Sequence, residues 1–89
     1  MAYSKSKYVE AAQKLLNQGK VPQAIAEYQQ ILKADPKHMA TLHNIVIVRL
    51  EERDTAAADQ VLKEMEQIDP NYEGLAPLRK RLAEVKAAK

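Results

Sequence analysis

The sequence contains no cysteine, no tryptophan and no phenylalanine, and only 2 of its 89 residues are glycine. Without cysteine there can be no disulfide, no thiolate metal ligand and no cysteine nucleophile. Two glycines and four prolines are too few for the many tight turns of a β-protein. Because aromatic residues make up only 4% of the chain, the composition favours helices around an aliphatic core.

Long apolar runs are also missing. The longest is "IVIV" at residues 45–48, far short of the roughly 18 residues that a membrane span needs. The lysines near the N-terminus are not followed by the apolar stretch of a signal peptide. A net charge of +2 does not give the electrostatic footprint of a dedicated nucleic-acid binder. We therefore expect a soluble, cytoplasmic protein whose partner is neither a membrane nor a nucleic acid.

Apolar residues recur at the three-and-four spacing of a helix face in five segments. These segments predict helices that start near residues 8, 22, 42, 55 and 75. Gly19 is expected to end the first helix, and Pro22 fits the first turn of the second. Asp54 or Thr55 is expected to be the N-cap of the fourth helix. The sequence therefore predicts an all-α chain.

The dipeptide Asp-Pro occurs twice, at residues 35–36 and at residues 69–70. Superposing residues 5–38 on 39–72 aligns the two copies and brings the apolar positions into step. This 34-residue period predicts one domain over residues 1–89, with a first helical hairpin at about 5–38 and a second at about 39–72. A capping helix at about 73–89 follows. Two unrelated hairpins that share a proline by chance remain the alternative.

A helix–turn–helix unit with this period resembles the tetratricopeptide repeat (TPR) family. Its pattern has apolar and small residues on the first helix, which match Tyr8, Ala11 and Ala12. Its second helix has an alanine, an aromatic four residues later and a final proline, which match Ala24, Tyr28 and Pro36; the second copy matches less well. The resemblance implies a right-handed solenoid of antiparallel helix hairpins with five helices.

The TPR resemblance also implies a non-catalytic adaptor or scaffold that binds a peptide or helix of a protein partner in a concave groove. Carried over by position, the groove residues are Val9, Gln13, Leu16, His43, Asn44, Ile47, Glu51 and Arg81. Ile47 suggests a contact site because it is one apolar residue more than the hairpin core needs. The alternative is a homo-oligomer that associates through an exposed face of the first hairpin, near Tyr3, Tyr8 and Tyr28.

One TPR subtype binds a C-terminal carboxylate with a clamp of Lys, Asn, Asn, Lys and Arg. Its five positions correspond here to Val9, Gln13, Asn44, Gly74 and Leu78, of which only Asn44 matches. The resemblance therefore does not extend to this clamp, and we do not expect a chaperone tail to be bound through it.

No set of residues predicts catalysis, a metal or a cofactor. His38 and His43 are five residues apart, which places them on different faces of a helix. No phosphate-binding glycine loop or acid–base pair accompanies the carboxylates near residue 52. The sequence therefore predicts a protein that is not an enzyme.

Two charged residues depart from the TPR pattern, which has apolar residues at both positions. Arg49 corresponds to Leu15 of the first hairpin, and Asp59 corresponds to Ile25. Because positions 49 and 59 lie roughly opposite each other in an antiparallel hairpin, we expect an ion pair; the alternative is that both side chains reach solvent. In the capping helix we expect an apolar stripe that includes Leu75, Leu78, Leu82 and Val85. The solvated side is expected to carry Arg79, Lys80, Arg81 and Lys86.

Overall fold

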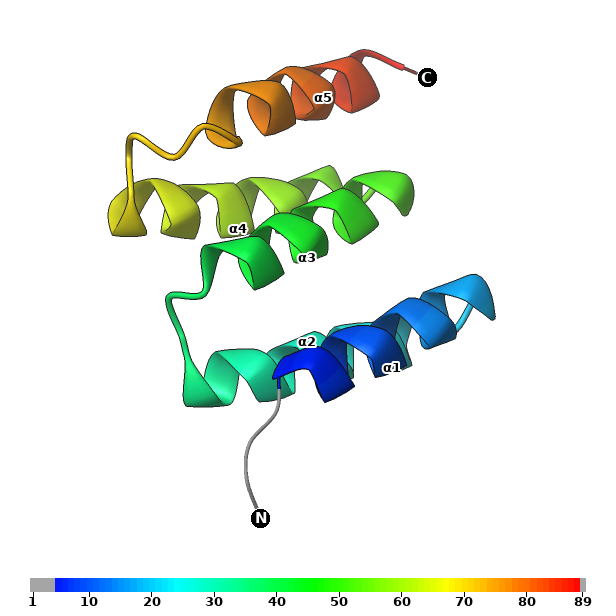
Figure 1. Cartoon of the computed structure of the whole chain (residues 1–89). Helices are drawn as coiled ribbons and strands as arrows, with labels where there is room; N and C mark the ends of the chain where they lie inside the picture. The colour runs from blue at the N-terminus through cyan, green and yellow to red at the C-terminus, as the bar shows by residue number, and fades with distance from the viewer. Residues whose placement is uncertain (1–4, 89) are drawn as a thin grey trace. The chain divides into compact units, whose positions relative to one another are not determined.

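The structure is a computed structural model that describes residues 5–88, the side chain of Lys5 excepted. Over these residues the chain is all α-helical, as predicted, with five helices and no strand (Figure 1). The helices are α1 (Lys5–Asn17), α2 (Val21–Ala34), α3 (Met39–Glu51), α4 (Thr55–Ile68) and α5 (Leu75–Ala87). None of these helices combines the length and the apolar character that crossing a bilayer requires.

The first four helices repeat with the period that the Asp-Pro pairs predict. Helices α1 and α3 cover residues 5–17 and 39–51, and α2 and α4 cover 21–34 and 55–68. Both pairs therefore keep the same 34-residue offset at their ends, and α2 and α4 keep it at their beginnings as well. A third copy of the period would begin a helix at residue 73, whereas α5 begins at residue 75. The local structure is thus repeated twice, and α5 begins outside the period.

The backbone of the turn between α1 and α2 is repeated in the turn between α3 and α4. Gly19 and Arg53, which occupy the same place in the 34-residue period, both have a positive φ, 75° and 62°. In each turn the N–H of this residue donates to the carbonyl three residues earlier at 3.0 Å. The next N–H donates to the carbonyl five residues before it at 2.8 Å in both turns. The two turns therefore share one conformation although their sequences differ.

The helix ends are formed by the residues that the sequence singles out. Asp35 and Asp69 are the C-caps of α2 and α4, and each precedes a proline, which disfavours a helical backbone before it. Pro22 lies in the first turn of α2, where its missing N–H costs no hydrogen bond. Asp54 is the N-cap of α4, and its carboxylate accepts a hydrogen bond from the Ala57 N–H at 3.2 Å.

The chain divides into two compact units that meet in the sequence between Thr41 and Leu42, near the start of α3. In the first unit α1 packs against α2. The buried apolar residues of these two helices are Ala12, Ala24, Ile25, Tyr28 and Ile31. Burial raises the pKa of Tyr28, because the phenolate would lose hydration in the core.

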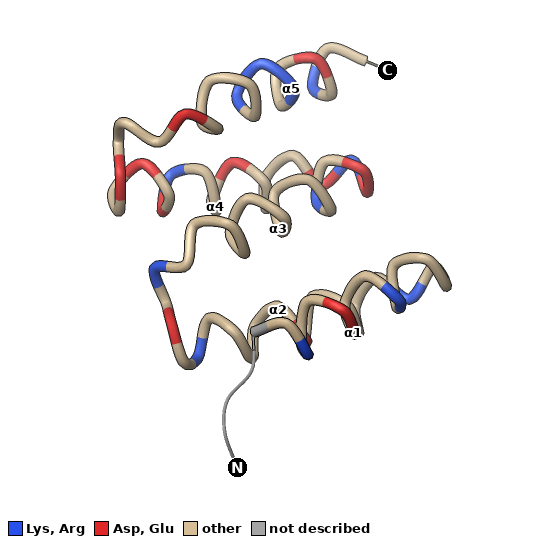
Figure 2. The backbone as a smooth tube through the Cα atoms, in the orientation of Figure 1, with Lys and Arg blue, Asp and Glu red and all other residues tan. Residues whose placement is uncertain are grey.

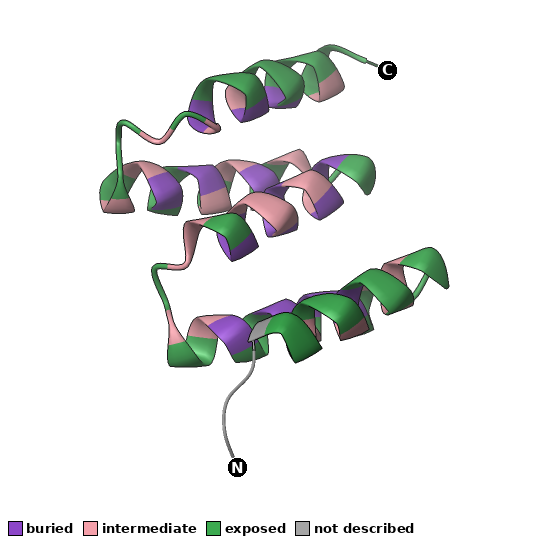
Figure 3. Cartoon of the chain, in the orientation of Figure 1, coloured by how far each residue is buried: buried purple, intermediate pink, exposed green. Residues whose placement is uncertain are grey.

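The second unit contains most of α3 together with α4 and α5, and α5 packs against α4. Its buried apolar residues are entirely aliphatic or methionine. Figure 3 shows buried positions along all three helices. They are Leu42, Ile45, Val46, Val48, Leu50, Ala58, Leu62, Met65, Leu75, Leu78 and Leu82. The predicted stripe of α5 is therefore buried at its three leucines, and Val85 at its end is half-buried.

Candidate functional site

Helix α5 is joined to α4 by a cluster of charged side chains. The Arg79 guanidinium donates to Asp59 Oδ1 at 2.9 Å and also to a carboxylate oxygen of Glu66. Lys63 Nζ lies 3.3 Å from the other oxygen of Asp59. The hydrogen bonds from Arg79 and Lys63 hold the pKa of Asp59 below its usual range. Figure 2 shows acidic and basic positions close together along α4 and α5. This cluster links α5 to α4 on the side of α5 that carries Arg79.

The predicted ion pair between Arg49 and Asp59 is wrong. Arg49 pairs with Glu52, three residues later on the same side of its helix, at 3.1 Å. Asp59 faces α5 and pairs with Arg79, which we expected to be solvated and which is only 37% exposed at its side chain. A neighbour one helical turn away needs little ordering of the chain, so Glu52 is the nearer partner for Arg49.

The loop between α4 and α5 is packed against the start of α3. Tyr72 and His43 share a hydrogen bond of 2.8 Å between the phenol oxygen and Nδ1, and their rings meet edge to face at 5.9 Å between centroids. A Cβ on Gly74 would lie 2.5 Å from the Tyr72 ring and 2.9 Å from His43 Nδ1. This arrangement therefore requires glycine at position 74. It positions the start of α5 relative to α3.

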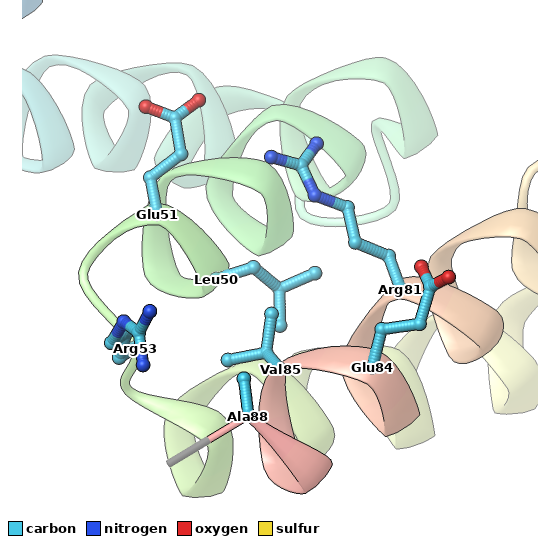
Figure 4. A pocket seen from close by; sticks show the side chains of 7 residues that line it. All are labelled: Leu50, Glu51, Arg53, Arg81, Glu84, Val85 and Ala88. Carbon is cyan, nitrogen blue, oxygen red and sulfur yellow. The ribbon is translucent and has the colours of Figure 1, made fainter.

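A pocket of about 360 Å³ lies in the second unit, between the end of α3 and the last turns of α5. Figure 4 shows Leu50, Val85 and Ala88 close together in its centre, with Arg53 on one side and Arg81 on the other. Two carboxylates, those of Glu51 and Glu84, complete the lining. The pocket thus has an apolar floor and a charged rim.

The charged groups of the rim are not neutralised by one another. Among the described residues, none of Glu51, Arg53, Arg81 and Glu84 forms a side-chain ion pair or hydrogen bond. The other two of the four arginines, Arg49 and Arg79, do form ion pairs. The unpaired arginines of residues 5–88 are therefore the two that line the pocket. Such groups are free to bind charges on a ligand.

The pocket brings together two of the five groove residues predicted in the second unit. Glu51 and Arg81, from α3 and α5, both line it and are exposed. His43, Asn44 and Ile47 are half-buried on α3 and do not line it. His43 is instead engaged by Tyr72. The prediction that Ile47 forms a contact stays a prediction.

The other three predicted groove residues lie on α1, in the first unit. Val9 and Gln13 are exposed and Leu16 is half-buried. Val9, at 37% exposure, is the one exposed large hydrophobic residue among the described residues. A single such residue does not make an apolar patch. Tyr3, from the self-association hypothesis, lies outside the described residues. A groove that combines these residues with those of α3 stays a prediction.

Five residues of the pocket were not predicted as site residues. They are Leu50, Arg53, Glu84, Val85 and Ala88. Val85 was expected in the apolar stripe of the capping helix. Arg53 was not assigned a role from the sequence. Its signal was nevertheless present, since the 34-residue period places it where the first hairpin has Gly19.

In the part of the chain that the structure describes, no group of three or more His, Cys, Asp or Glu side chains could hold a metal ion. Comparison of the chain with protein-family models, with curated proteins and with solved structures found no match. The pocket must therefore be interpreted from its own residues.

Proposed function

We propose that this chain is a TPR-type helical repeat protein that binds a peptide or helix of a protein partner and has no catalytic role. The repeat is supported by the 34-residue offset of the helices and by the shared conformation of the two turns. Short helical hairpins at this period occur in repeat proteins, which use their side-chain surfaces for recognition.

The observation that carries this proposal is that charged side chains at the rim of the pocket form no ion pair with a described residue. Glu51 and Arg81 come from two different helices, lie beside an apolar floor and form no ion pair with a described residue. Apolar pockets with a few convergent polar groups are the usual form of a binding site. The proposal therefore rests on the second unit alone.

The proposal is tested by capturing partners from a lysate with the tagged chain and with charge-reversed variants. Glu51→Lys and Arg81→Glu change exposed side chains, so both should leave the fold intact. Lys80→Glu is the matched control, because it reverses an exposed charge on α5 that does not line the pocket. We expect a partner that is retained by Lys80→Glu and lost by both pocket variants. Loss in all three variants, or in none, would refute a partner site at this pocket.

Self-association through an exposed face of the first hairpin is the second candidate, and Val9, exposed on α1, is a position where it can be tested. Light scattering on a sizing column at two concentrations about tenfold apart separates the two candidates. A monomer at both concentrations supports the binding module. A dimer that is lost in Val9→Lys supports self-association through this face.

A further inference from the structure

The backbone of Arg53 is unusual for an arginine. Its φ of 62° lies in the left-handed region, where a Cβ approaches the following carbonyl oxygen. At the equivalent place in the first hairpin the chain has Gly19, with φ 75° and the same two hydrogen bonds. Glycine takes this conformation without the steric cost. The turn therefore does not require arginine, and the reason for arginine lies in its side chain.

The Arg53 side chain lines one side of the pocket (Figure 4). It has no ion-pair partner among the described residues, and neither does Arg81 on the other side. Residues in sparsely populated conformations tend to lie at functional sites, where the surrounding structure holds them. The guanidinium of Arg53 lines a pocket and has no partner in the described part of the chain, so it is available to bind an anionic group of a ligand.

The floor and the other rim residues further restrict the chemistry of a complementary ligand. The half-buried Val85 and the exposed Ala88 offer apolar contact, and Leu50, only 2% exposed, lies buried beside them. A volume of about 360 Å³ is at the small end for ligand pockets and suits one large side chain. Glu51 and Glu84 also line the opening, so a second negative charge on the ligand would face a carboxylate. The complementary group is therefore one apolar side chain with one carboxylate next to it.

We propose that this pocket binds a partner peptide by one large apolar side chain, placed over Val85 and Ala88, and by a single carboxylate bound to Arg53. This proposal rests on the proposed function and names the chemistry of the partner. A guanidinium and a carboxylate form paired, charge-assisted hydrogen bonds, which are stronger than neutral ones. The carboxylate belongs either to an aspartate or glutamate side chain or to a peptide C-terminus.

The test is an NMR titration of the full, ¹⁵N-labelled chain with three small probes. Acetyl-Leu-Asp-amide carries a side-chain carboxylate, N-acetyl-leucine carries a terminal one, and acetyl-Leu-Asn-amide carries neither. We expect saturable shifts at the amides of Leu50, Arg53 and Val85, with binding of at least one acidic probe about tenfold tighter than that of the neutral probe. The stronger of the two acidic probes identifies the source of the carboxylate.

Arg53→Gly is the decisive variant. Glycine suits the backbone of this turn, so the variant should fold and give an unchanged spectrum away from the turn. It should bind the acidic and neutral probes equally, whereas Lys80→Ala, which removes one positive charge elsewhere on α5, should keep the tenfold preference. Equal binding of all three probes to the unmodified chain, or no saturable shift at the pocket, would overturn the proposal. An equal loss in Lys80→Ala would also overturn it, because it would show general attraction to positive charge.

Failure of this titration leaves the proposed function separately testable. If Glu51→Lys and Arg81→Glu still abolish capture of a partner, the surface binds protein and only the chemistry assigned to Arg53 is wrong. If capture is also unaffected, the proposed function fails with it.

Discussion

The turn between α1 and α2 and the turn between α3 and α4 have the same backbone conformation, but different residues stabilise them. The first turn has Gly19, which suits a positive φ, followed by Lys20, whose side chain does not cap α2. The second has Arg53, which does not suit it, followed by Asp54, whose carboxylate caps α4. One turn is thus stabilised by a compatible φ and the other by a helix cap. The same backbone conformation can therefore be stabilised by different residues in the two copies of the repeat.

The first helices of the two hairpins differ in the same way. Of residues 6–17 in α1 only Ala12 is buried, whereas α3 buries six residues (Figure 3). Lys7 and Lys14 of α1 are exposed, and the equivalent residues of α3, Thr41 and Val48, are buried. Equivalent positions therefore have the same helical structure but differ in burial. The residue types agree with this difference, since the exposed positions are lysines and the buried ones are threonine and valine.

The largest expected effect comes from the cores, where the two hairpins should behave alike. Leu62, which is fully buried, is equivalent to Tyr28, at 2% exposure. Leu62→Ala should lower the free energy of unfolding by about 2–5 kcal/mol, through lost burial and the cavity left behind. Urea unfolding followed by circular dichroism measures the change, with the exposed Gln60→Ala as control. A midpoint unchanged from that of the control would show that position 62 is not a core position.

The turns should respond in opposite directions to changes at the equivalent residues. Gly19→Ala should cost about 1 kcal/mol, because a Cβ there meets no atom within 4 Å and only the positive φ opposes it. Arg53→Gly should leave stability unchanged or raise it by up to about 1 kcal/mol for the same reason. Both are measured by urea unfolding. A loss of stability in Arg53→Gly would show that the arginine side chain stabilises the free protein.

The cap of the second turn should matter less than the backbone of the first. Asp54→Ala removes the acceptor for the Ala57 N–H and should cost about 0.5–1 kcal/mol, the lower part of the usual range, because this 3.2 Å bond is exposed. Lys20→Asp should add the missing cap to α2 and raise stability by a similar or smaller amount. If Asp54→Ala costs nothing while Lys20→Asp stabilises, the comparison between the turns would have to be reversed.

Much of this fold could be predicted from the sequence because its signals are local. Several helix ends are determined by residues within one turn of the chain, namely Pro22, Asp54 and the Asp-Pro pairs. Helix α5 begins at Leu75, where the apolar spacing indicates. Leu75, Leu78 and Leu82 are buried as predicted. These features depend on residues only a few positions apart.

The ion pairs and most of the pocket could not be predicted, because they depend on how α5 is rotated. Arg79 reaches α4 from outside the two repeated hairpins, so aligning the hairpins could not reveal it. The same rotation places Arg81 and Val85 beside Leu50. Glu51 and Arg81 were predicted as site residues from the TPR resemblance, and the pocket unites them. Arg53 was detectable only by asking why the period has glycine in one copy and arginine in the other.

The smallest expected effect sharpens the comparison at positions 25 and 59, where the first hairpin has a buried isoleucine and the second an ion-paired aspartate. The pKa of Asp59 is lowered in the folded state, so its contribution to stability is present above its unfolded pKa, near 4, and is lost as the pH falls through the folded value. The stability difference between the unmodified chain and Asp59→Asn should therefore be constant from about pH 7 to 5 and shrink below about pH 4.

Arg79→Met provides the matched background for this measurement, since Arg79 is the main cause of the lowered pKa of Asp59. In that background the pH dependence of the Asp59→Asn effect should become smaller, with only Lys63 left to lower the pKa. Urea unfolding at a series of pH values between 2 and 7 measures both curves. An unchanged pH dependence in the Arg79→Met background would mean that the ion pair between α4 and α5 does not hold Asp59 in solution. Lys63, on the same helix as Asp59, would then be the cation that lowers the pKa of Asp59.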